Sequence, residues 1–414
     1  MKKILALMLA VLMVCGLFAG CSNPETPSTP SGDPDPKPTY KVAMVTDYGD
    51  ITDQSFNQTT GEAVVKFGTD NKIDTKYYKP TDNTTAARVA SVELAVAEGY
   101  NVIVLPGYAF GGTIAEIAAE YPAVKFIALD VAKGDLLEAA VALKGEQYDY
   151  NPDNWDLEDY VDMSNVYCAI YQEELCGYMA GYAAVKLGYT KLGFLGGMAV
   201  PAVIRYGYGF VQGADAAAKE LNITIDMKYA YGNQFFGDAD ITARMDTWYQ
   251  GGTEVVFACG GGIYTSAVDA AKKVTGAKVI GVDVDQAAVI AAYAAGADAS
   301  EELVNSFKAL TVTSAMKGLA PTTIDTLTDV LIKDKWDDYK GKIDTLGLVS
   351  GDDPSLNYVQ IAASTQFEEG KFTEADYKAL VKAMFDGTIT VSNDITAAEP
   401  TAEKVTIDFQ GNIK

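Results

Sequence analysis

The residues with the clearest chemical potential lie in the segment 45–58, VTDYGDITDQSFNQ. This segment follows the apolar run KVAMV and combines three aspartates with a serine, a phenylalanine and an asparagine. Ionised carboxylates accept hydrogen bonds from hydroxyls and from ring or amide N–H groups, which suits a polar ligand rich in donors. A phenylalanine ring beside them can stack on a planar ligand. The segment is therefore either a solvated loop that leads into a helix or one half of a binding pocket.

Other carboxylates follow apolar runs in the same way. The run VKFIALD ends at Asp130 and KVIGVDVD at Asp283 and Asp285, just as KVAMVTD ends at Asp47. A single carboxylate at such a place is commonplace, because aspartate favours turns and helix N-caps. Several of them together favour a shared role at one edge of a sheet.

Two further features of these strand ends bear on ligand binding. Ser55 is well placed as the N-cap of a following helix, so that Phe56 either faces a cleft or packs as a staple on its own helix. Gly260 and Gly261, in ACGGGIYTSAVDAAKK, let the backbone approach a ligand closely. That segment lacks the Gly-Lys-Ser/Thr of a phosphate-binding loop, and the third glycine of YGYGFVQG falls one residue late for a dinucleotide fingerprint. A nucleotide phosphate is therefore unsupported.

The composition excludes several classes of function. The chain of 414 residues has a net charge of −24, and such an acidic surface repels nucleic acid. It contains no histidine, which removes the commonest metal ligand and the commonest general base near neutral pH. A Ser-His-Asp or Cys-His catalytic arrangement cannot be assembled from it.

The elements that must position these residues alternate regularly along the chain. Most strand candidates are continuous apolar runs, which are typical of parallel strands covered on both faces. Ala-rich helical segments lie between them, such as TTAARVASVELAVAEG and SAVDAAKKVTG, and both end in glycine. The sequence therefore predicts a doubly wound α/β fold. The strand candidates are KVAMVTD, DTKYYKP, NVIVLPG, VKFIALD, NVYCAIY, KLGFLGG, IDMKYAYG, VVFACGG and KVIGVDVD.

The length and the number of strand–helix cycles predict two similar lobes. A second cycle begins near Asn165, after the polar excursion GEQYDYNPDNWDLEDYVDMSN. We expect one lobe from residues 40–163 plus 287–325 and the other from 164–286 plus 326–414. Ligands of open parallel sheets bind beyond the carboxyl ends of the strands, so the cleft between the lobes is the expected site.

The N-terminus predicts export and a lipid anchor. MKK and a short apolar core form a signal peptide over residues 1–20, and LFAGC resembles the lipobox of bacterial lipoproteins, in which Cys21 is acylated. The alternative is a plain secretory signal or an uncleaved anchor. Residues 21–39 then form a proline-rich linker with a reach of roughly 50 Å. Loss of Lys2 and Lys3 with the signal would bring the net charge from −24 to −26.

The cysteines predict neither a disulfide framework nor a zinc site. Cys15 lies in the signal peptide and Cys21 is the acylation site. The other three, Cys168, Cys176 and Cys259, are irregularly spaced, and we expect them to be buried free thiols.

Together these features resemble the basic membrane protein family, the nucleoside-binding lipoproteins that serve ABC importers. The resemblance runs from the lipobox to about residue 320 and more loosely to the end. It rests on VTDYGDITDQSFNQ, FIALD, LGFLGGMAVPAVIRYGYGFVQGA, ACGGG, GVDVDQ and TSAMKG. It implies a type I periplasmic-binding-protein fold that closes on a purine nucleoside and delivers it to membrane permease subunits. No enzymatic activity, cofactor or metal is implied, and membrane contact is through the lipid alone.

The resemblance also implies roles for individual residues. Phe56 would stack on one face of the base and Tyr206, where the family usually has phenylalanine, on the other. Ser55 fits either a ligand contact or a helix cap. The expected polar contacts are Asp47, Asn57 and Asp130 around the base, and Asp283, Lys317 and the backbone near Gly260 and Gly261 around the ribose.

Three alternatives remain open from the sequence. Lys317 follows the long segment AAVIAAYAAGADASEELVNSFKAL and could instead be a surface lysine on a helix. The same fold could bind a sugar or a signalling molecule, because two stacking aromatic rings fit sugars as well as bases. A nucleoside hydrolase would need a positioned water, often on a metal held by clustered aspartates, whereas the aspartates here are scattered over several strand ends.

Beyond residue 320 we expect two helical segments, DTLTDVLIKDKWDDYKGK and TEADYKALVKAMFDGTI, and a final strand in KVTIDFQGNIK.

Overall fold

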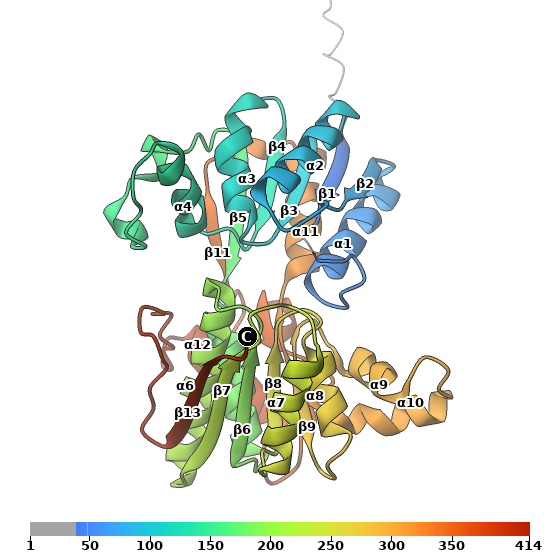
Figure 1. The fold of residues 1–414 in the computed structure, drawn as a ribbon, viewed down its shortest axis with the longest axis vertical. Helices are drawn as coiled ribbons and strands as arrows, with labels where there is room; N and C mark the ends of the chain where they lie inside the picture. Colours follow the sequence, from blue (N-terminus) through green and yellow to red (C-terminus); the bar gives the residue numbers. More distant parts are fainter. Residues whose placement is uncertain (1–38, 48) are drawn as a thin grey trace, which may run out of the picture. The chain divides into compact units, whose positions relative to one another are not determined.

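Short apolar runs after residue 40 form the strands of two separate sheets, each covered by helices (Figure 1). The computed structural model describes residues 39–47 and 49–414. The predicted signal peptide, the acylation site Cys21 and the linker up to residue 38 lie outside the described residues. Among the described residues, every strand pair but one is parallel; the exception is the antiparallel pair of β10 (Thr311–Lys317) and β12 (Val359–Ile361). The predicted doubly wound α/β class is confirmed.

The first lobe is built on a sheet with the strand order β11-β5-β4-β3-β1-β2. Helices α2, α3 and α4 pack their apolar side chains on one face, while α1 and α11 pack together on the other. The strands are β1 Lys41–Val45, β2 Asp74–Tyr78, β3 Val102–Pro106, β4 Lys125–Leu129, β5 Val166–Tyr171 and β11 Ile343–Leu346. The helices are α1 Phe56–Asn71, α2 Thr85–Ala97, α3 Phe110–Ile117, α4 Lys133–Leu143 and α11 Leu319–Leu327.

The second lobe is built on a sheet with the order β12-β10-β9-β8-β6-β7-β13. Helices α5 and α6 cover one face, and α7, α8 and α9 cover the other. The strands are β6 Lys191–Gly196, β7 Ile225–Tyr231, β8 Val255–Cys259, β9 Lys278–Asp283, β10 Thr311–Lys317, β12 Val359–Ile361 and β13 Val405–Asn412. The helices are α5 Glu173–Lys186, α6 Pro201–Leu221, α7 Ala239–Gln250, α8 Tyr264–Ala271, α9 Ala287–Ala295, α10 Glu301–Phe307 and α12 Glu374–Phe385.

The lobe boundaries differ from those expected from the sequence. β5, expected to open the second lobe, pairs with β4 in the first sheet. α9 and β10, expected in the first lobe, belong to the second, because β10 pairs in parallel with β9. The excursion at residues 145–165 is thus an insertion within the first lobe, between α4 and β5. The chain crosses between the lobes after β5, after β10 and between β11 and β12.

Glycines set the packing of α5 against α6. A Cβ added at Gly213 would lie 1.9 Å from the carbonyl oxygen of Tyr178, and one at Gly181 would lie 2.1 Å from that of Phe210. Gly209 and Gly213 of YGYGFVQG therefore allow two helix backbones to approach closely, and Gly207 lies against the side chains of Tyr229 and Phe194. These contacts account for the glycines without a dinucleotide. The contact between α5 and α6 fixes the start of α6, where Arg205 and Tyr206 lie.

The C-terminal quarter follows its expected pattern in part. The expected helix DTLTDVLIKDKWDDYKGK is wrong as an α-helix for most of its length, because it holds only the end of α11, a π-helical turn at Thr328–Ile332 and a short 3-10 helix at Trp336–Asp338. The expected helix TEADYKALVKAMFDGTI forms α12, and the expected final strand is β13, which pairs in parallel with β7. Cys168, Cys176 and Cys259 are free and buried, as predicted. Among the described residues, no helix combines the length and apolar character needed to cross a bilayer.

Candidate functional site

The carboxyl ends of strands from both sheets border one cavity of about 390 Å³. That volume falls in the usual range for small-molecule sites, roughly 300–1,000 Å³. Of the residues predicted to bind ligand, Ser55 does not border the cavity. The other residues predicted to bind ligand all border the cavity: Asp47, Phe56, Asn57, Asp130, Tyr206, Gly260, Gly261, Asp283 and Lys317.

Lys317 is the central cation of this site. It ends β10, so it is not the surface helix lysine that the sequence left open, and its side chain is only 3% exposed. Its Nζ pairs with Asp130 and lies 3.4 Å from Glu173 Oε1 and 3.7 Å from Asp283 Oδ1. Burial alone would lower the pKa of the ammonium group, but the three carboxylates raise it overall. Lys317 is therefore held in its charged, donating form.

Aromatic rings surround the same ammonium group. The Nζ atom lies 4.8 Å from the ring centroid of Phe56, 5.6 Å from that of Tyr171 and 5.7 Å from that of Tyr206. Such distances allow cation–π attraction, which strengthens when water is excluded. Phe56, at the start of α1, thus faces the cavity and Lys317.

Two aspartates turn into the cavity through a left-handed backbone. Asp130, directly after β4, has φ 60°, and Asp283, the last residue of β9, has φ 64°. Aspartate tolerates this region better than most side chains. Asp130 Oδ1 is buried and has no hydrogen-bond partner among the described residues. Burial raises the pKa of Asp130 to about 6, with Lys317 acting in the opposite direction.

Asn57 presents a second buried acceptor. Its Nδ2 donates to Asp47 Oδ1 at 3.2 Å and to Asp53 Oδ2 at 3.0 Å, and these two carboxylates set the orientation of the amide. Its Oδ1 therefore points away from them, and within the described part of the chain it has no hydrogen-bond partner. An unpaired buried acceptor is costly, so a ligand donor is the natural partner.

Asp53, and not Ser55, caps helix α1. The Asp53 carboxylate accepts from the backbone N–H groups of Asn57 at 2.8 Å and Gln58 at 3.1 Å. Ser55 occupies the N-cap position but makes no capping bond with its side chain. Its Oγ donates instead to Asp283 Oδ2 at 2.8 Å, on the other lobe. The capping role expected for the Ser55 side chain is therefore wrong, and Ser55, which does not border the cavity, links the two lobes through Asp283.

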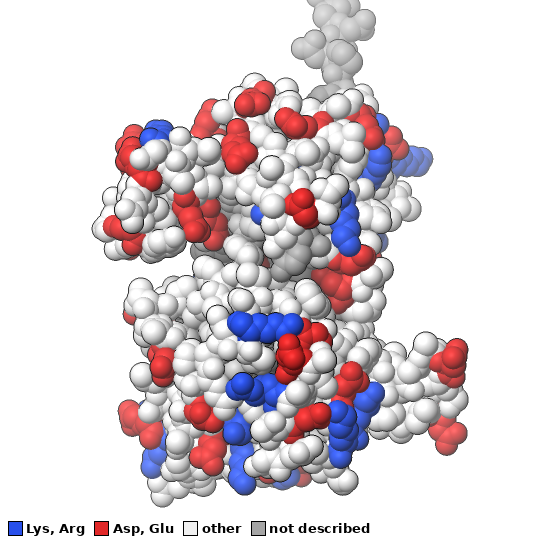
Figure 2. All heavy atoms as spheres, viewed as in Figure 1, with Lys and Arg blue, Asp and Glu red and all other residues white. Residues whose placement is uncertain are grey.

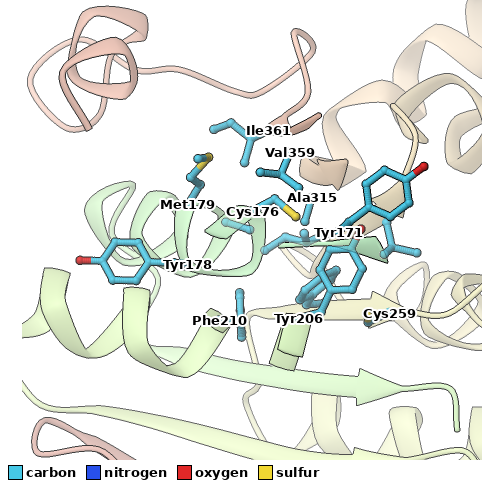
Figure 3. Packing of buried hydrophobic residues seen from close by; sticks show 14 of the residues in the cluster. Tyr171, Cys176, Tyr178, Met179, Tyr206, Phe210, Cys259, Ala315, Val359 and Ile361 are labelled. Atoms are coloured by element: carbon cyan, nitrogen blue, oxygen red, sulfur yellow. The ribbon is translucent and has the colours of Figure 1, made fainter. Parts of the chain in front are cut away.

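Tyr206 borders the cavity but packs mainly in the core of the second lobe. Its side chain is 1% exposed, and its ring meets Phe257 edge-on, with centroids 6.0 Å apart and planes at 85°. Figure 3 shows Tyr206 among the apolar residues of this core. Its hydroxyl donates to Asp283 Oδ1 at 3.4 Å. This packing leaves little of the ring free for stacking, so Phe56 and Tyr206 do not form an open pair of ring faces.

The sequence reasoning missed an aromatic pair after β7. Phe235 and Phe236 both border the cavity, and Phe236 is 55% exposed. Phe235 fills the space above Gly197 and Gly260, where an added Cβ would lie 2.4 Å and 2.9 Å from its ring. Gly260 has φ 151° and Gly261 φ 50°, backbone angles that suit glycine. The available signal was two adjacent phenylalanines between turn residues in YGNQFFGD.

A buried ion pair next to the cavity was also missed. Arg205 borders the cavity from α6, and its Nε donates to Glu173 Oε2 at 2.7 Å. Glu173 is fully buried at the start of α5. Nothing in the local sequence YQEELCG distinguishes this glutamate from the usual acidic residue of a helix start.

The charge around the cavity disfavours anions. Lys317 and Arg205 are the basic residues that border it, and both are already paired with carboxylates. Burial raises the pKa of Asp135 to about 7, as expected for a crowded acidic site. Figure 2 shows acidic side chains spread over both lobes of the face in view. The aspartates that border the cavity are Asp47, Asp50, Asp53, Asp130, Asp135 and Asp283.

Comparison with known proteins identifies the family of this fold and site. The family model described as ABC transporter substrate-binding protein, PnrA-like (Bmp) matches residues 40–367. The chain belongs to the Bmp family. Bmp proteins are substrate-binding proteins of ABC transporters, so the function class expected from the sequence is confirmed at this level.

Curated relatives agree with membership of the Bmp family. The ABC transporter nucleoside-binding protein BmpA of Lactococcus lactis subsp. cremoris is 27% identical over 337 residues, which cover 78% of this chain and 85% of the relative. The CD4+ T-cell-stimulating antigen of Listeria innocua is 29% identical over 300 residues, covering 69% and 74%. The basic membrane protein B of Borreliella burgdorferi is 26% identical over 251 residues, covering 59% and 65%.

Solved structures confirm the fold of this Bmp protein. A solute-binding protein of an ABC transporter system from Aeropyrum pernix superposes with a TM-score of 0.59 at 18% identity, covering 85% of this chain and 87% of the other. One from Conexibacter woesei gives 0.58 at 20% identity, covering 86% and 99%. The two-lobe binding-protein fold implied by the resemblance is therefore confirmed.

Proposed function

We propose that this Bmp-family protein captures purine nucleosides of the adenosine, guanosine and inosine type between its lobes for import. The observation that carries the proposal is a pair of buried acceptors, Asn57 Oδ1 and Asp130 Oδ1, that have no hydrogen-bond partner in the described part of the chain and belong to residues bordering the cavity beside the ring of Phe56. A purine base offers ring and amino N–H donors to such acceptors and a flat surface to the ring. The scarcity of free cations around the cavity favours a nucleoside over a nucleotide.

The proposed binding mode assigns the two ends of the ligand to different groups. Phe56 stacks on the base, a contact typically worth about 1–3 kcal/mol per base. Asp47, Asn57 and Asp130 accept hydrogen bonds around the base. Ribose hydroxyls donate to Asp283, while Lys317 donates back to ribose oxygens and offsets the buried negative charge.

The relatives support this choice of ligand. The Lactococcus lactis relative is named as a nucleoside-binding protein. The segments that carry the family resemblance contain the cavity residues Asp47, Phe56, Asn57, Asp130, Asp283 and Lys317.

The proposal includes a membrane tether and a permease. Acylation of Cys21 and a proline-rich spacer would hold the two lobes just outside the cell membrane, where they would meet ABC permease subunits. Labelling cells with a fatty-acid analogue tests the anchor: wild-type protein should take up label and C21S should not.

The experiment that tests the ligand has two steps. Freshly purified protein is denatured, and released small molecules are identified by mass spectrometry; a purine nucleoside is expected. Ligand-free protein is then titrated by calorimetry with adenosine, adenine, ribose and galactose. A site built around ribose hydroxyls rejects ligands that lack them, so adenosine should bind at least about tenfold more tightly than adenine. Equal affinity for the two, or binding of the sugars alone, would refute the proposal.

A further inference from the structure

A fully buried carboxylate lies where the chain passes from the first lobe to the second. β5 ends at Tyr171, and Glu173 is the first residue of α5, with only Gln172 between them. The Glu173 side chain is 0% exposed and does not border the cavity. A charge buried at this depth is retained only when it is paired.

The partners of Glu173 are the basic residues that border the cavity. Its Oε2 accepts from Arg205 Nε at 2.7 Å, and its Oε1 lies 3.4 Å from Lys317 Nζ. Arg205 comes from α6, and Lys317 ends β10, immediately before the second crossing between the lobes. The Glu173 carboxylate thus connects the crossing after β5 and the crossing after β10 to helix α6.

The same carboxylate controls where the two cations point. Without it, Lys317 Nζ would be left with Asp130 and Asp283 alone. Arg205 would also lose its hydrogen-bonded partner, while Asp130 and Asp135 already attract its charge. Arg205 in return holds the other oxygen of Glu173, so this carboxylate fixes the direction of the Lys317 ammonium group that borders the cavity.

We propose that Glu173 is a positioning residue for ligand binding: it orients Lys317 toward the ribose without touching the ligand. This inference rests on the proposed function for the identity of the ligand. A purely structural role would instead make Glu173 important for folding and equally important for every ligand.

A comparison of adenosine with adenine, which lacks the ribose, distinguishes a positioning role of Glu173 from a purely structural one. In E173Q we expect affinity for adenosine to fall about tenfold, the equivalent of one charge-assisted hydrogen bond, and affinity for adenine to change less than about twofold. In K317M, adding E173Q should have little further effect on adenosine binding, because the two residues act through one contact. E173D, which keeps the charge, should restore part of the loss. Equal losses for adenosine and adenine, or additive effects of E173Q and K317M, would overturn the proposal.

The neighbouring residue provides a matched control. Glu174 follows in the same helix and is 2% exposed, but its Oε2 has no hydrogen-bond partner among the described residues and it does not border the cavity. At pH 8, above the raised pKa of about 7 of the Glu174 carboxyl, E174Q removes a charge as E173Q does and should leave adenosine affinity unchanged within about twofold. A loss in E174Q as large as in E173Q would show that any charge change at this helix start disturbs binding, and would overturn the specific role of Glu173.

A measurement without ligand distinguishes failure of this inference from failure of the proposed function. Lysines are acetylated with a water-soluble ester, and the rate at each is followed by peptide mass spectrometry. Lys317, 3% exposed, should be protected in the wild type and react several-fold faster in E173Q, while Lys333, 54% exposed, should not change. Unchanged protection of Lys317 overturns the inference. A wild type that binds neither adenosine nor adenine refutes the nucleoside proposal alone.

Discussion

The ammonium group of Lys317 is enclosed by carboxylates from both lobes and by aromatic rings. Ion pairs buried to this degree contribute little net stability, because the desolvation of both partners offsets most of their attraction. They do fix geometry, since a displaced partner would leave a buried charge uncompensated. At the scale of single residues, the site is therefore better described as a set of oriented charges than as a source of folding energy.

The two aromatic residues predicted to stack should respond differently to truncation. F56A removes a ring that faces the cavity, so adenosine affinity should fall by about 1–3 kcal/mol while the unfolding free energy changes little. Y206A removes a ring packed against Phe257 and should lower the unfolding free energy by about 3–5 kcal/mol. Calorimetric titration and urea unfolding of both variants test this. A Y206A protein of normal stability with lost adenosine binding would restore the stacking role of Tyr206.

Local sequence predicted the position of a site residue more readily than its contacts. Asp47 and Asp130 lie at strand ends, so the rule for parallel sheets placed them at the cavity. The burial of Tyr206 depends on Phe257 of β8, and the pairing of Glu173 depends on Arg205 of α6. No rule based on neighbours in sequence contains such contacts.

At the scale of elements, two polar residues at the start of α1 have different roles: Asp53 caps the helix, and Ser55 contacts the other lobe. Asp53 satisfies the free N–H groups of the helix, which releases the Ser55 hydroxyl to reach Asp283. Both residue types are good N-caps, so the sequence DQSFN could not settle which one would cap. Gln54, between them, adopts a left-handed φ of 57°.

Separate substitutions of Asp53 and Ser55 test these two roles. D53A should lower the unfolding free energy by about 1–2 kcal/mol, the usual contribution of a cap. S55A removes a hydrogen bond to a charged acceptor on the other lobe and should weaken adenosine binding about tenfold, with little change in the thermal midpoint of the ligand-free protein. Differential scanning fluorimetry and calorimetric titration measure the two effects. A destabilised S55A protein with normal affinity would contradict this division.

The strands β1 to β9 and β13 were predictable as elements, whereas β10, β11 and β12 were not predicted, and neither was the distribution of the strands between the lobes. Continuous apolar runs identify buried parallel strands one at a time. Which sheet a strand joins depends on pairing with a distant partner, as β5 pairs with β4 and β11 pairs with β5. The excursion at residues 145–165 was expected to lie between the lobes, but an insertion within one lobe and a crossover between two have the same polar composition.

At the scale of the whole molecule, contacts across the cavity link ligand binding to closure of the lobes. Ser55 Oγ donates to Asp283, Lys317 pairs with Asp130, and Gln286 Nε2 donates to the carbonyl oxygen of Gln54 at 3.3 Å. Each of these contacts joins an element of one lobe to an element of the other. A ligand that binds Asp130 and Asp283 together would bind the closed arrangement of the lobes more tightly than the open one, and would therefore increase the closed population.

The stability of the whole fold should depend on pH through Glu174. Burial raises the pKa of this carboxyl to about 7 from its ordinary value of 4.5, and the neighbouring Glu173 adds to the rise. A carboxyl with a raised folded-state pKa binds its proton more tightly in the folded protein, so its contribution is most favourable below pH 4.5 and is lost as the pH rises through 7. Because glutamine does not ionise, E174Q removes this pH-dependent loss of stability. At pH 8 the variant should be more stable than the wild type by up to about 3 kcal/mol, and the difference should vanish near pH 4.5. Urea unfolding of both proteins between pH 4.5 and 8 measures it. A difference that does not vary with pH would mean that Glu174 ionises normally in the folded protein.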